Sequence, residues 1–239
     1  MSAPSHDERT DGSPLGRPLP AAVLFDMDGT LIDTEPLWMA AEVELTSRFD
    51  VPWSAADATE LVGSAMTHSA QVLRTRGVDL PVATIVTELT ASVAAAVVRR
   101  VPWQPGAREA LETVRRAGVR TALVTSSYRA LTDPFVGAAG GFDAVVAGDD
   151  GHAGKPDPEP YLKAARLLGV PIERCVAIED SRAGVASALA SGARTLAVEG
   201  VQQVADRPGL SRIRTLRDLS LEVLRDLAAG EVLDVLPVR

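Results

Sequence analysis

Five short apolar runs, each followed by polar residues, constrain most strongly how this chain can fold. The runs occupy residues 21–25, 121–125, 144–146, 175–178 and 195–198. Continuous apolar runs of this length are typical of strands buried on both faces. Helical patterns lie between most of them, at residues 109–114, 160–168 and 183–190, each ending near a glycine. Strands that alternate with helices predict an α/β fold, in which helices cover both faces of a parallel sheet.

The alternation is interrupted once, by about ninety residues between Asp28 and Val119. A crossover between neighbouring strands needs far fewer residues. Two sets of apolar residues in this gap each fall on one helical face: Leu37, Ala41, Leu45 and Phe49, and then Ile85, Leu89, Val93 and Val97. We therefore expect an all-helical cap over residues 34–102, inserted into a core of residues 20–33 and 103–239. Pro102 and Pro105 mark the return to the core.

The two ends of the chain differ in character. Residues 1–20 carry four prolines, mixed charge and almost no apolar residues, so residues 1–19 are predicted to form a disordered tail. Residues 200–239 contain a weak strand pattern near residues 212–215 and a leucine-rich amphipathic helix pattern.

Composition excludes several classes of partner. A net charge of −8 argues against binding to nucleic acid, because phosphate backbones are held by basic surfaces. No apolar run approaches the ~20 residues that span a bilayer, so no membrane contact is expected. Cys175 is the only cysteine, and nothing demands an oxidising compartment, so we expect a cytoplasmic protein. The charged, aromatic-poor sequence indicates no large interface, and a monomer is expected.

Polar residues follow the predicted strands, where ligands bind in open α/β sheets. Asp26 and Asp28 follow the first run, Thr125 the second, and Glu179 and Asp180 the fourth. Carboxylates crowded at one edge repel one another unless a cation lies among them, and oxygen ligands favour Mg²⁺. Asp26 and Asp28 are two residues apart, which suits a nucleophile and a general acid/base acting on one phosphoryl group.

A single lysine follows the third run. Only two of the 24 basic residues are lysines, Lys155 and Lys163. Lys155 offers a compact charge that can contact a phosphate and the attacking carboxylate together. Lys163 lies in a helical pattern and is expected to be solvated, and Cys175 begins a strand and is expected in the core.

Four segments of the chain resemble, in order, the four motifs of the haloacid dehalogenase-like hydrolase superfamily, specifically its phosphatases with a helical cap. These segments are residues 25–35, 124–127, 154–161 and 178–181. The resemblance implies a Rossmann-like core and an aspartyl-phosphate formed on Asp26, with Asp28 as acid/base.

The resemblance also implies which residues bind the phosphate and the metal. The phosphate-binding residues are Met27, Asp28, Thr125, Ser126 and Lys155. Mg²⁺ is held by Asp26, the backbone of Asp28, and Asp180 with help from Glu179. Two alternatives remain open at this point: Ser126 and Ser127 offer hydroxyls that compete with that of Thr125, and Glu179 could cap the following helix instead of assisting the metal.

The expected function is Mg²⁺-dependent hydrolysis of a small phosphorylated metabolite, such as a sugar phosphate or phosphoglycolate. A β-phosphoglucomutase-like mutase is the nearest alternative. However, Val62 and Met66 stand where such mutases carry a lysine and an arginine, and Trp38 replaces their cap-hinge histidine. A non-enzymatic phospho-acceptor, such as a receiver domain, would lack the large helical insert.

Overall fold

The core of the protein is a parallel sheet of six strands. The computed structural model describes residues 16–61, 66–200 and 204–235. The strand order is β3-β2-β1-β4-β5-β6, and every pairing is parallel. The strands are β1 (Ala22–Phe25), β2 (Arg120–Val124), β3 (Ala144–Val146), β4 (Cys175–Glu179), β5 (Arg194–Val198) and β6 (Leu210–Ile213). The α/β fold expected from the apolar runs is confirmed.

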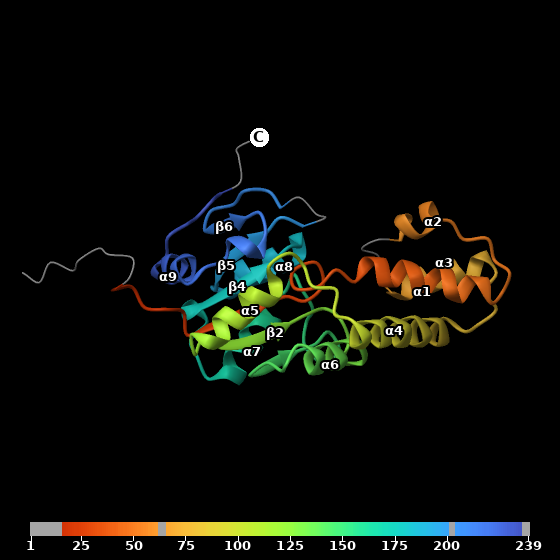
Figure 1. Ribbon diagram of the computed structural model, residues 1–239, viewed down its shortest axis with the longest axis horizontal. Helices are drawn as coiled ribbons and strands as arrows, with labels where there is room; N and C mark the ends of the chain where they lie inside the picture. The colour runs from red at the N-terminus through yellow and green to blue at the C-terminus, as the bar shows by residue number, and fades with distance from the viewer. Residues whose placement is uncertain (1–15, 62–65, 201–203, 236–239) are drawn as a thin grey trace, which may run out of the picture.

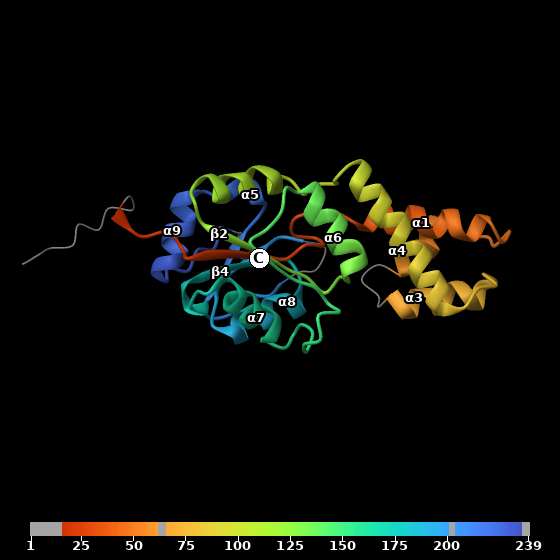
Figure 2. The same ribbon diagram turned by 90° about the horizontal axis from the view of Figure 1, so that it is seen from below.

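Helices cover both faces of this sheet. They are α5 (Ala107–Arg116), α6 (Arg129–Ala138), α7 (Glu159–Leu168), α8 (Arg182–Ser191) and α9 (Leu221–Ala229). Val23 and Phe25 pack toward α5, α6 and α9, whereas Ala22 and Leu24 pack toward α7 and α8. Figure 2 shows α5 and α7 on opposite sides of the strands. Strand β1 is fully buried because both of its faces are covered, which explains its continuous apolar sequence.

Four helices lie between β1 and β2. They are α1 (Glu35–Ser47), α2 (Ala55–Glu60), α3 (Met66–Arg76) and α4 (Val82–Arg99), and they stand to one side of the sheet in Figure 1. Helix α4 packs against α1 and α3, and also against α6 of the core. The insert is helical in its described residues, as the two apolar faces indicate. The domain boundaries at residues 34 and 102 stay a prediction.

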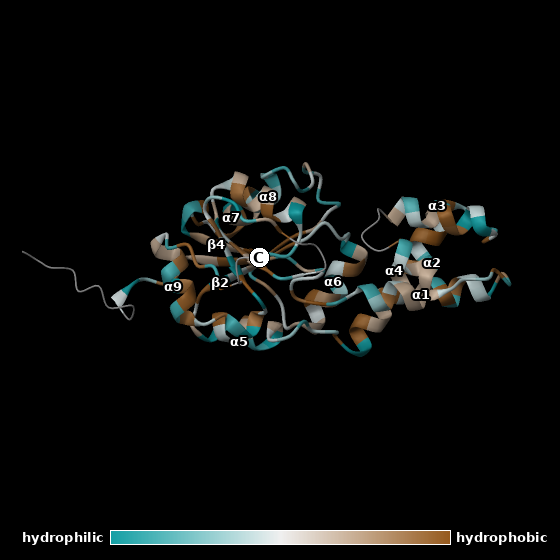
Figure 3. Cartoon of the chain, turned by 90° about the horizontal axis from the view of Figure 1, so that it is seen from above, coloured by the Kyte–Doolittle hydropathy of each residue, from teal (hydrophilic) through white to brown (hydrophobic). Residues whose placement is uncertain are grey.

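Helix α4 is long and apolar, a property that the sequence predictions did not take into account. By length and composition alone this helix, Val82–Arg99, could cross a membrane. Its residues Ile85, Leu89, Val93 and Val97 are instead buried in the protein core. Figure 3 shows hydrophobic and hydrophilic residues on the same helices, as expected where one face of a helix is buried.

Some segments differ from the sequence expectations. Residues 1–15 of the predicted tail lie outside the described residues. Within residues 16–19, Arg17 pairs with Asp226 at 3.0 Å and Leu19 packs against the core. The weak strand expected near residues 212–215 is β6, two residues earlier. Helix α6 was missed, and it carries Pro134 inside it, a residue that weakens a helical pattern.

Candidate active site

The predicted site residues gather at the carboxyl ends of β1, β2 and β4. Asp26 follows β1, and its backbone N–H donates to the carbonyl of Ile178 in β4 at 3.0 Å. Thr125 follows β2 and Asp180 follows β4. The chain runs outward from β1 through β2 to β3, and then returns to the other side of β1 for β4. The site therefore lies at the point where the strand order reverses, which is where open α/β sheets bind ligands.

Lys155 connects two of the acidic residues in this site. Its Nζ donates to Oδ1 of Asp26 at 2.7 Å, to Oε1 of Glu179 at 2.5 Å and to the carbonyl of Val124 at 2.8 Å. Only 4% of the side chain is exposed. Burial alone would lower the pKa of this ammonium group, but the charges of Asp26 and Glu179 outweigh it and hold the pKa above its ordinary value. Lys155 therefore remains a buried cation.

Three buried carboxylates stand close together beside this lysine. Ligand oxygens of Asp26, Glu179 and Asp180 all lie within 4.8 Å of one another. Burial, and next the charge of Glu179, raise the pKa of Asp26 well above its usual value. The same two causes raise the pKa of Asp180 to about 7. Buried carboxylates that are crowded together and have raised pKa values are typical of a site that holds a divalent cation.

The surroundings of Asp180 fit such a cation. Its Oδ1 accepts a hydrogen bond from the Thr30 hydroxyl at 3.2 Å, and its carboxylate lies against Gly29. A Cβ atom at Gly29 would stand 2.1 Å from Oδ2 of Asp180, and Gly29 has a φ of +89°. Only glycine leaves room for the carboxylate here. The donor set contains oxygen atoms alone, which suits Mg²⁺.

Asp28 is held by hydroxyl groups. Its Oδ1 accepts from Thr34 at 2.7 Å, and its Oδ2 accepts from Ser127 at 2.7 Å and from Thr125 at 3.4 Å. Thr34 precedes the first turn of α1, where a threonine commonly caps the helix, yet its hydroxyl makes no cap bond. The carboxylate of Asp28 is therefore fixed between the first cap helix and the loop after β2.

Both oxygens of Glu179 have protein donors. Oε1 accepts from Lys155 and from the Tyr161 hydroxyl at 2.7 Å, and Oε2 accepts from the Ser181 hydroxyl at 3.2 Å. A Cβ atom at Gly184 would stand 1.9 Å from Oε1, so the carboxylate lies directly against the first turn of α8. Ser181, and not Glu179, caps this helix, through the N–H of Gly184. The role of Glu179 as a metal ligand stays a prediction.

The remaining predicted phosphate binders take different positions. Thr125 is buried and its hydroxyl faces Asp28, whereas Ser126 is exposed. Met27 is buried behind Asp26, and its carbonyl accepts from the N–H groups of Leu31 and Ile32. The proposed contacts of Met27, Thr125 and Ser126 with phosphate stay predictions.

Lys163 and Cys175 lie outside the four motif segments, and the structure shows where each side chain lies. Lys163 was expected to be solvated, but its Nζ donates to the carbonyl of Asp150 at 2.8 Å. The Lys163 side chain is 27% exposed, so it is partly solvated as well as hydrogen-bonded. Cys175 is buried in the core, as expected, and burial raises the pKa of its thiol to about 11.

Several hydroxyl groups of the site were not assigned from the sequence. They belong to Thr34 and Ser127, which contact Asp28, to Thr30, which contacts Asp180, and to Tyr161 and Ser181, which contact Glu179. Ser127 was considered only as a competitor of Thr125. Thr34 and Tyr161 stand inside motif segments, but nothing in their spacing showed which side chain each contacts.

A comparison with protein families covers the part of the chain that contains these strand-end residues. The model of the haloacid dehalogenase-like hydrolases matches residues 20–192. The chain belongs to this family. The resemblance of the four motif segments to its capped phosphatases is thereby confirmed, and with it the expected class of enzyme, a phosphoric monoester hydrolase.

Similar proteins of this family include sugar-phosphate enzymes. The chain is 33% identical over 189 residues to Protein CbbY of Rhodobacter capsulatus, covering 73% of this chain and 83% of that protein. It is 29% identical to hexitol phosphatase B of Escherichia coli strain K12, covering 89% and 96%. Among solved structures, CbbY of Rhodobacter sphaeroides in complex with xylulose-(1,5)bisphosphate has a TM-score of 0.70 at 29% identity, covering 84% of this chain and 96% of the other.

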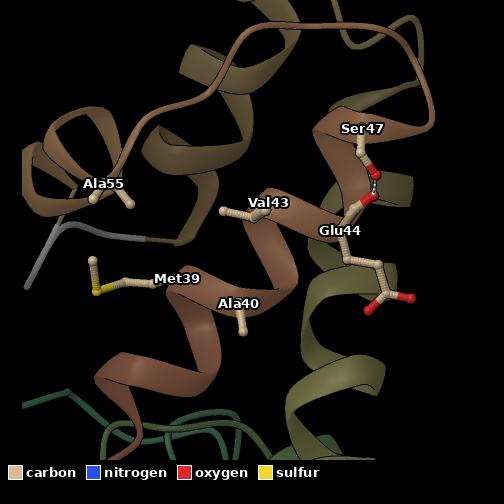
Figure 4. A pocket seen from close by; sticks show the side chains of 7 residues that line it. Met39, Ala40, Val43, Glu44, Ser47 and Ala55 are labelled. Atoms are coloured by element: carbon tan, nitrogen blue, oxygen red, sulfur yellow. Dashed lines mark hydrogen bonds between the residues drawn. The ribbon is translucent and has the colours of Figure 1, made fainter.

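A separate hollow of about 450 Å³ lies between α1 and α2 (Figure 4). Its lining is mostly apolar, and Glu44 and Ser47 stand at one end. None of its lining residues belongs to the predicted site. The hollow is therefore a feature of the cap and not of the strand-end cluster.

Proposed function

We propose that the protein is a Mg²⁺-dependent phosphatase that hydrolyses a small phosphorylated metabolite of the sugar-phosphate type through an aspartyl-phosphate. The contact of Lys155 with Asp26, with Asp28 held two residues further on, carries this proposal. Phosphoryl transfer needs a positioned nucleophile, a proton donor and positive charge at the transferring group. Asp26, Asp28 and Lys155 provide these three groups at one edge of the sheet.

The chemistry follows from these positions in two steps. Oδ of Asp26 forms a bond to phosphorus while the bond from phosphorus to the substrate alkoxide breaks, and Asp28 gives its proton to that oxygen. Asp28, now a carboxylate, then takes a proton from water as the water attacks phosphorus and releases Asp26. Acid/base help of this kind contributes about 10²–10⁴-fold. Lys155 stabilises the charge on the phosphoryl oxygens in both steps.

The residues that would hold Mg²⁺ are Asp26 and Asp180, with the backbone carbonyl of Asp28 and with Glu179 as a further candidate. The bound ion would supply positive charge that draws phosphate oxygens and carboxylates together. Thr30 and Gly29 then serve this site indirectly, by orienting Asp180 and leaving room for it.

The substrate class rests on the similar proteins. One of them is a hexitol phosphatase, and another was solved in complex with xylulose-(1,5)bisphosphate. Both names refer to compact, phosphorylated polyols or sugars. We therefore propose a sugar phosphate as the substrate, with phosphoglycolate, which is smaller and carries an additional carboxylate, as a second candidate.

Phosphate release from p-nitrophenyl phosphate and from a panel of sugar phosphates tests the proposal. Activity is expected with Mg²⁺ and is expected to be lost with a chelator. Asp26→Asn should abolish phosphate release while leaving the circular dichroism spectrum unchanged. Appreciable turnover by that variant would remove Asp26 as the nucleophile.

The same assay separates the mutase alternative. A phosphatase releases inorganic phosphate from β-glucose 1-phosphate, whereas a mutase converts it to the 6-phosphate. The position of Val62 lies outside the described residues. Met66 begins α3 and offers no charge for a second phosphate. We expect inorganic phosphate as the product.

A further inference from the structure

Tyr161 is a buried tyrosine whose hydroxyl reaches into the charged part of the site. The residue lies in α7 and is completely buried among apolar side chains. Its hydroxyl donates to Oε1 of Glu179 at 2.7 Å, the same oxygen that accepts from Lys155. Nζ of Lys155 also stands 5.3 Å from the centre of the Tyr161 ring. Tyr161 therefore contacts both members of a buried ion pair.

Oε1 of Glu179 accepts hydrogen bonds from both Tyr161 and Lys155, so its position determines where the Lys155 ammonium group lies. Glu179 is fully buried, so its charge is weakly screened and attracts the ammonium group strongly. The Tyr161 hydroxyl satisfies part of that charge and fixes the carboxylate from the other side. Asp26 then retains its contact with the same ammonium group, at 2.7 Å. Without the hydroxyl, Lys155 would be the remaining side-chain donor to Oε1 among the described residues, and the other partners of Glu179 contact Oε2.

We propose that Tyr161 is a positioning residue for the phosphoryl-transfer reaction. It holds Oε1 of Glu179 so that Lys155 stays within reach of Asp26 and of the phosphate bound there. This inference rests on the proposed function where it concerns catalysis. The placement of Lys155 itself can be tested without any substrate.

Tyr161→Phe is the decisive variant, because it keeps the ring against Lys155 and removes only the hydroxyl. Thr195→Val is its matched control. Thr195 is 1% exposed, and its hydroxyl donates to the carbonyl of Ala193 at 3.2 Å, away from the site. Both variants lose one buried hydrogen bond and should show a similar loss of thermal stability. Only Tyr161→Phe should alter Lys155.

The first readout is the ammonium signal of Lys155 in protein labelled with ¹⁵N at the lysine Nζ atoms. The chain has two lysines, so the spectrum holds at most two such signals, and Lys163 is an internal reference. We expect a slowly exchanging Lys155 signal in the unsubstituted protein and its loss or displacement in Tyr161→Phe. An unchanged Lys155 signal in Tyr161→Phe would overturn the proposal, whatever the stability of the variant.

The second readout is kinetic and uses p-nitrophenyl phosphate. We expect kcat to fall by about threefold to tenfold in Tyr161→Phe, the factor that one hydrogen bond corresponds to. The Mg²⁺ concentration for half-maximal activity should stay the same, because Tyr161 contacts neither Asp26 nor Asp180, and in this proposal Glu179 acts on Lys155 and not as a ligand of the metal. A rise in that concentration matching the fall in kcat would show that the hydroxyl acts through the metal, against the proposal. If the unsubstituted protein hydrolyses no phosphomonoester, the proposed function fails, and the ¹⁵N signal still decides the role of Tyr161.

Discussion

Nζ of Lys155 lies 2.7 Å from Oδ1 of Asp26, although 129 residues separate them in the chain. The lysine comes from the loop before α7 and the aspartate from the end of β1. Val124 and Glu179 supply its other two acceptors. Three acceptors in different directions suit an ammonium group, which donates three hydrogen bonds from one atom, better than a planar guanidinium.

Lys155→Arg should therefore impair catalysis while keeping the charge. The guanidinium cannot place one nitrogen among all three acceptors in a site where 4% of the side chain is exposed. We expect kcat to fall by about 10²–10³-fold, the range seen when a group that stabilises the transition state is displaced. Turnover of p-nitrophenyl phosphate measures this, and circular dichroism checks the fold.

Lys163→Arg is the matched control for that variant. Lys163 is the other lysine, 27% of its side chain is exposed, and its Nζ donates to a backbone carbonyl in the loop after β3. The same substitution there should leave kcat within about twofold, since exposed charged groups contribute little to stability or position. Equal activity of the two variants would show that the ammonium geometry at Lys155 does not matter.

The hydroxyl of Thr34 provides a second test. It donates to Asp28 at 2.7 Å and leaves the start of α1 without a side-chain cap. Thr34→Val should lower kcat by about tenfold, because Asp28 loses a hydrogen-bond donor that orients its carboxyl group. Thr34→Ser keeps the hydroxyl and should restore most of the activity. If valine and serine give the same kcat, the hydroxyl does not position Asp28.

The central strands could be predicted from the sequence because a strand buried on both faces carries apolar residues at successive positions. Strand β1 is a run of apolar residues with no alternation and is followed directly by Asp26, and β4 begins with four apolar residues that are followed by Glu179 and Asp180. Their position at one sheet edge then follows from parallel topology alone. Helix α6 was missed because Pro134 and few large apolar residues weaken its periodicity.

The hydroxyl partners could not be predicted for a different reason. Ser127 and Asp28 are 99 residues apart, and Tyr161 and Glu179 are 18 residues apart on different elements. A hydroxyl can serve many acceptors, so its residue type does not identify its partner. Only the packing of α7 against the sheet brings Tyr161 to Glu179, and that packing depends on the whole fold.

Gly29→Ala should weaken metal binding specifically. An added Cβ would stand 2.1 Å from Oδ2 of Asp180 and must displace that carboxylate. Gly118→Ala is the control, because Gly118 also has a positive φ, +71°, but has open space around it. Both variants should lose about 1–2 kcal/mol of stability from the left-handed conformation.

The two glycine variants should differ in their response to Mg²⁺. Calorimetric titration with Mg²⁺ should show at least about a tenfold weaker affinity for Gly29→Ala, consistent with the loss of one well-placed carboxylate. Gly118→Ala should bind Mg²⁺ as the unsubstituted protein does. Equal affinities would place the metal away from Asp180.

A buried acid in the cap predicts how stability depends on pH. Glu42 of α1 is 5% exposed, and its Oε2 has no hydrogen-bond partner among the described residues. Burial raises its pKa from 4.5 to about 7, and the nearby charge of Glu35 adds to this. Between these two pH values the folded protein holds a proton here that the unfolded chain releases. The free energy of unfolding should therefore fall as pH rises from about 4.5 to about 7.

Glu42→Gln should remove that dependence, because the amide stays neutral at every pH. At pH 8 the variant should be more stable than the unsubstituted protein by about 1–3 kcal/mol, because the unsubstituted protein then holds an ionised carboxylate in a buried position and one unit of pKa shift corresponds to about 1.4 kcal/mol. At pH 4.5 the two should differ little, since Glu42 is then protonated in the folded protein. Urea unfolding followed by tryptophan fluorescence measures both, with exposed Glu44→Gln on the same helix as the control. A stability difference between Glu42→Gln and the unsubstituted protein that is the same at pH 4.5 and pH 8 would mean that folding does not raise the pKa of Glu42.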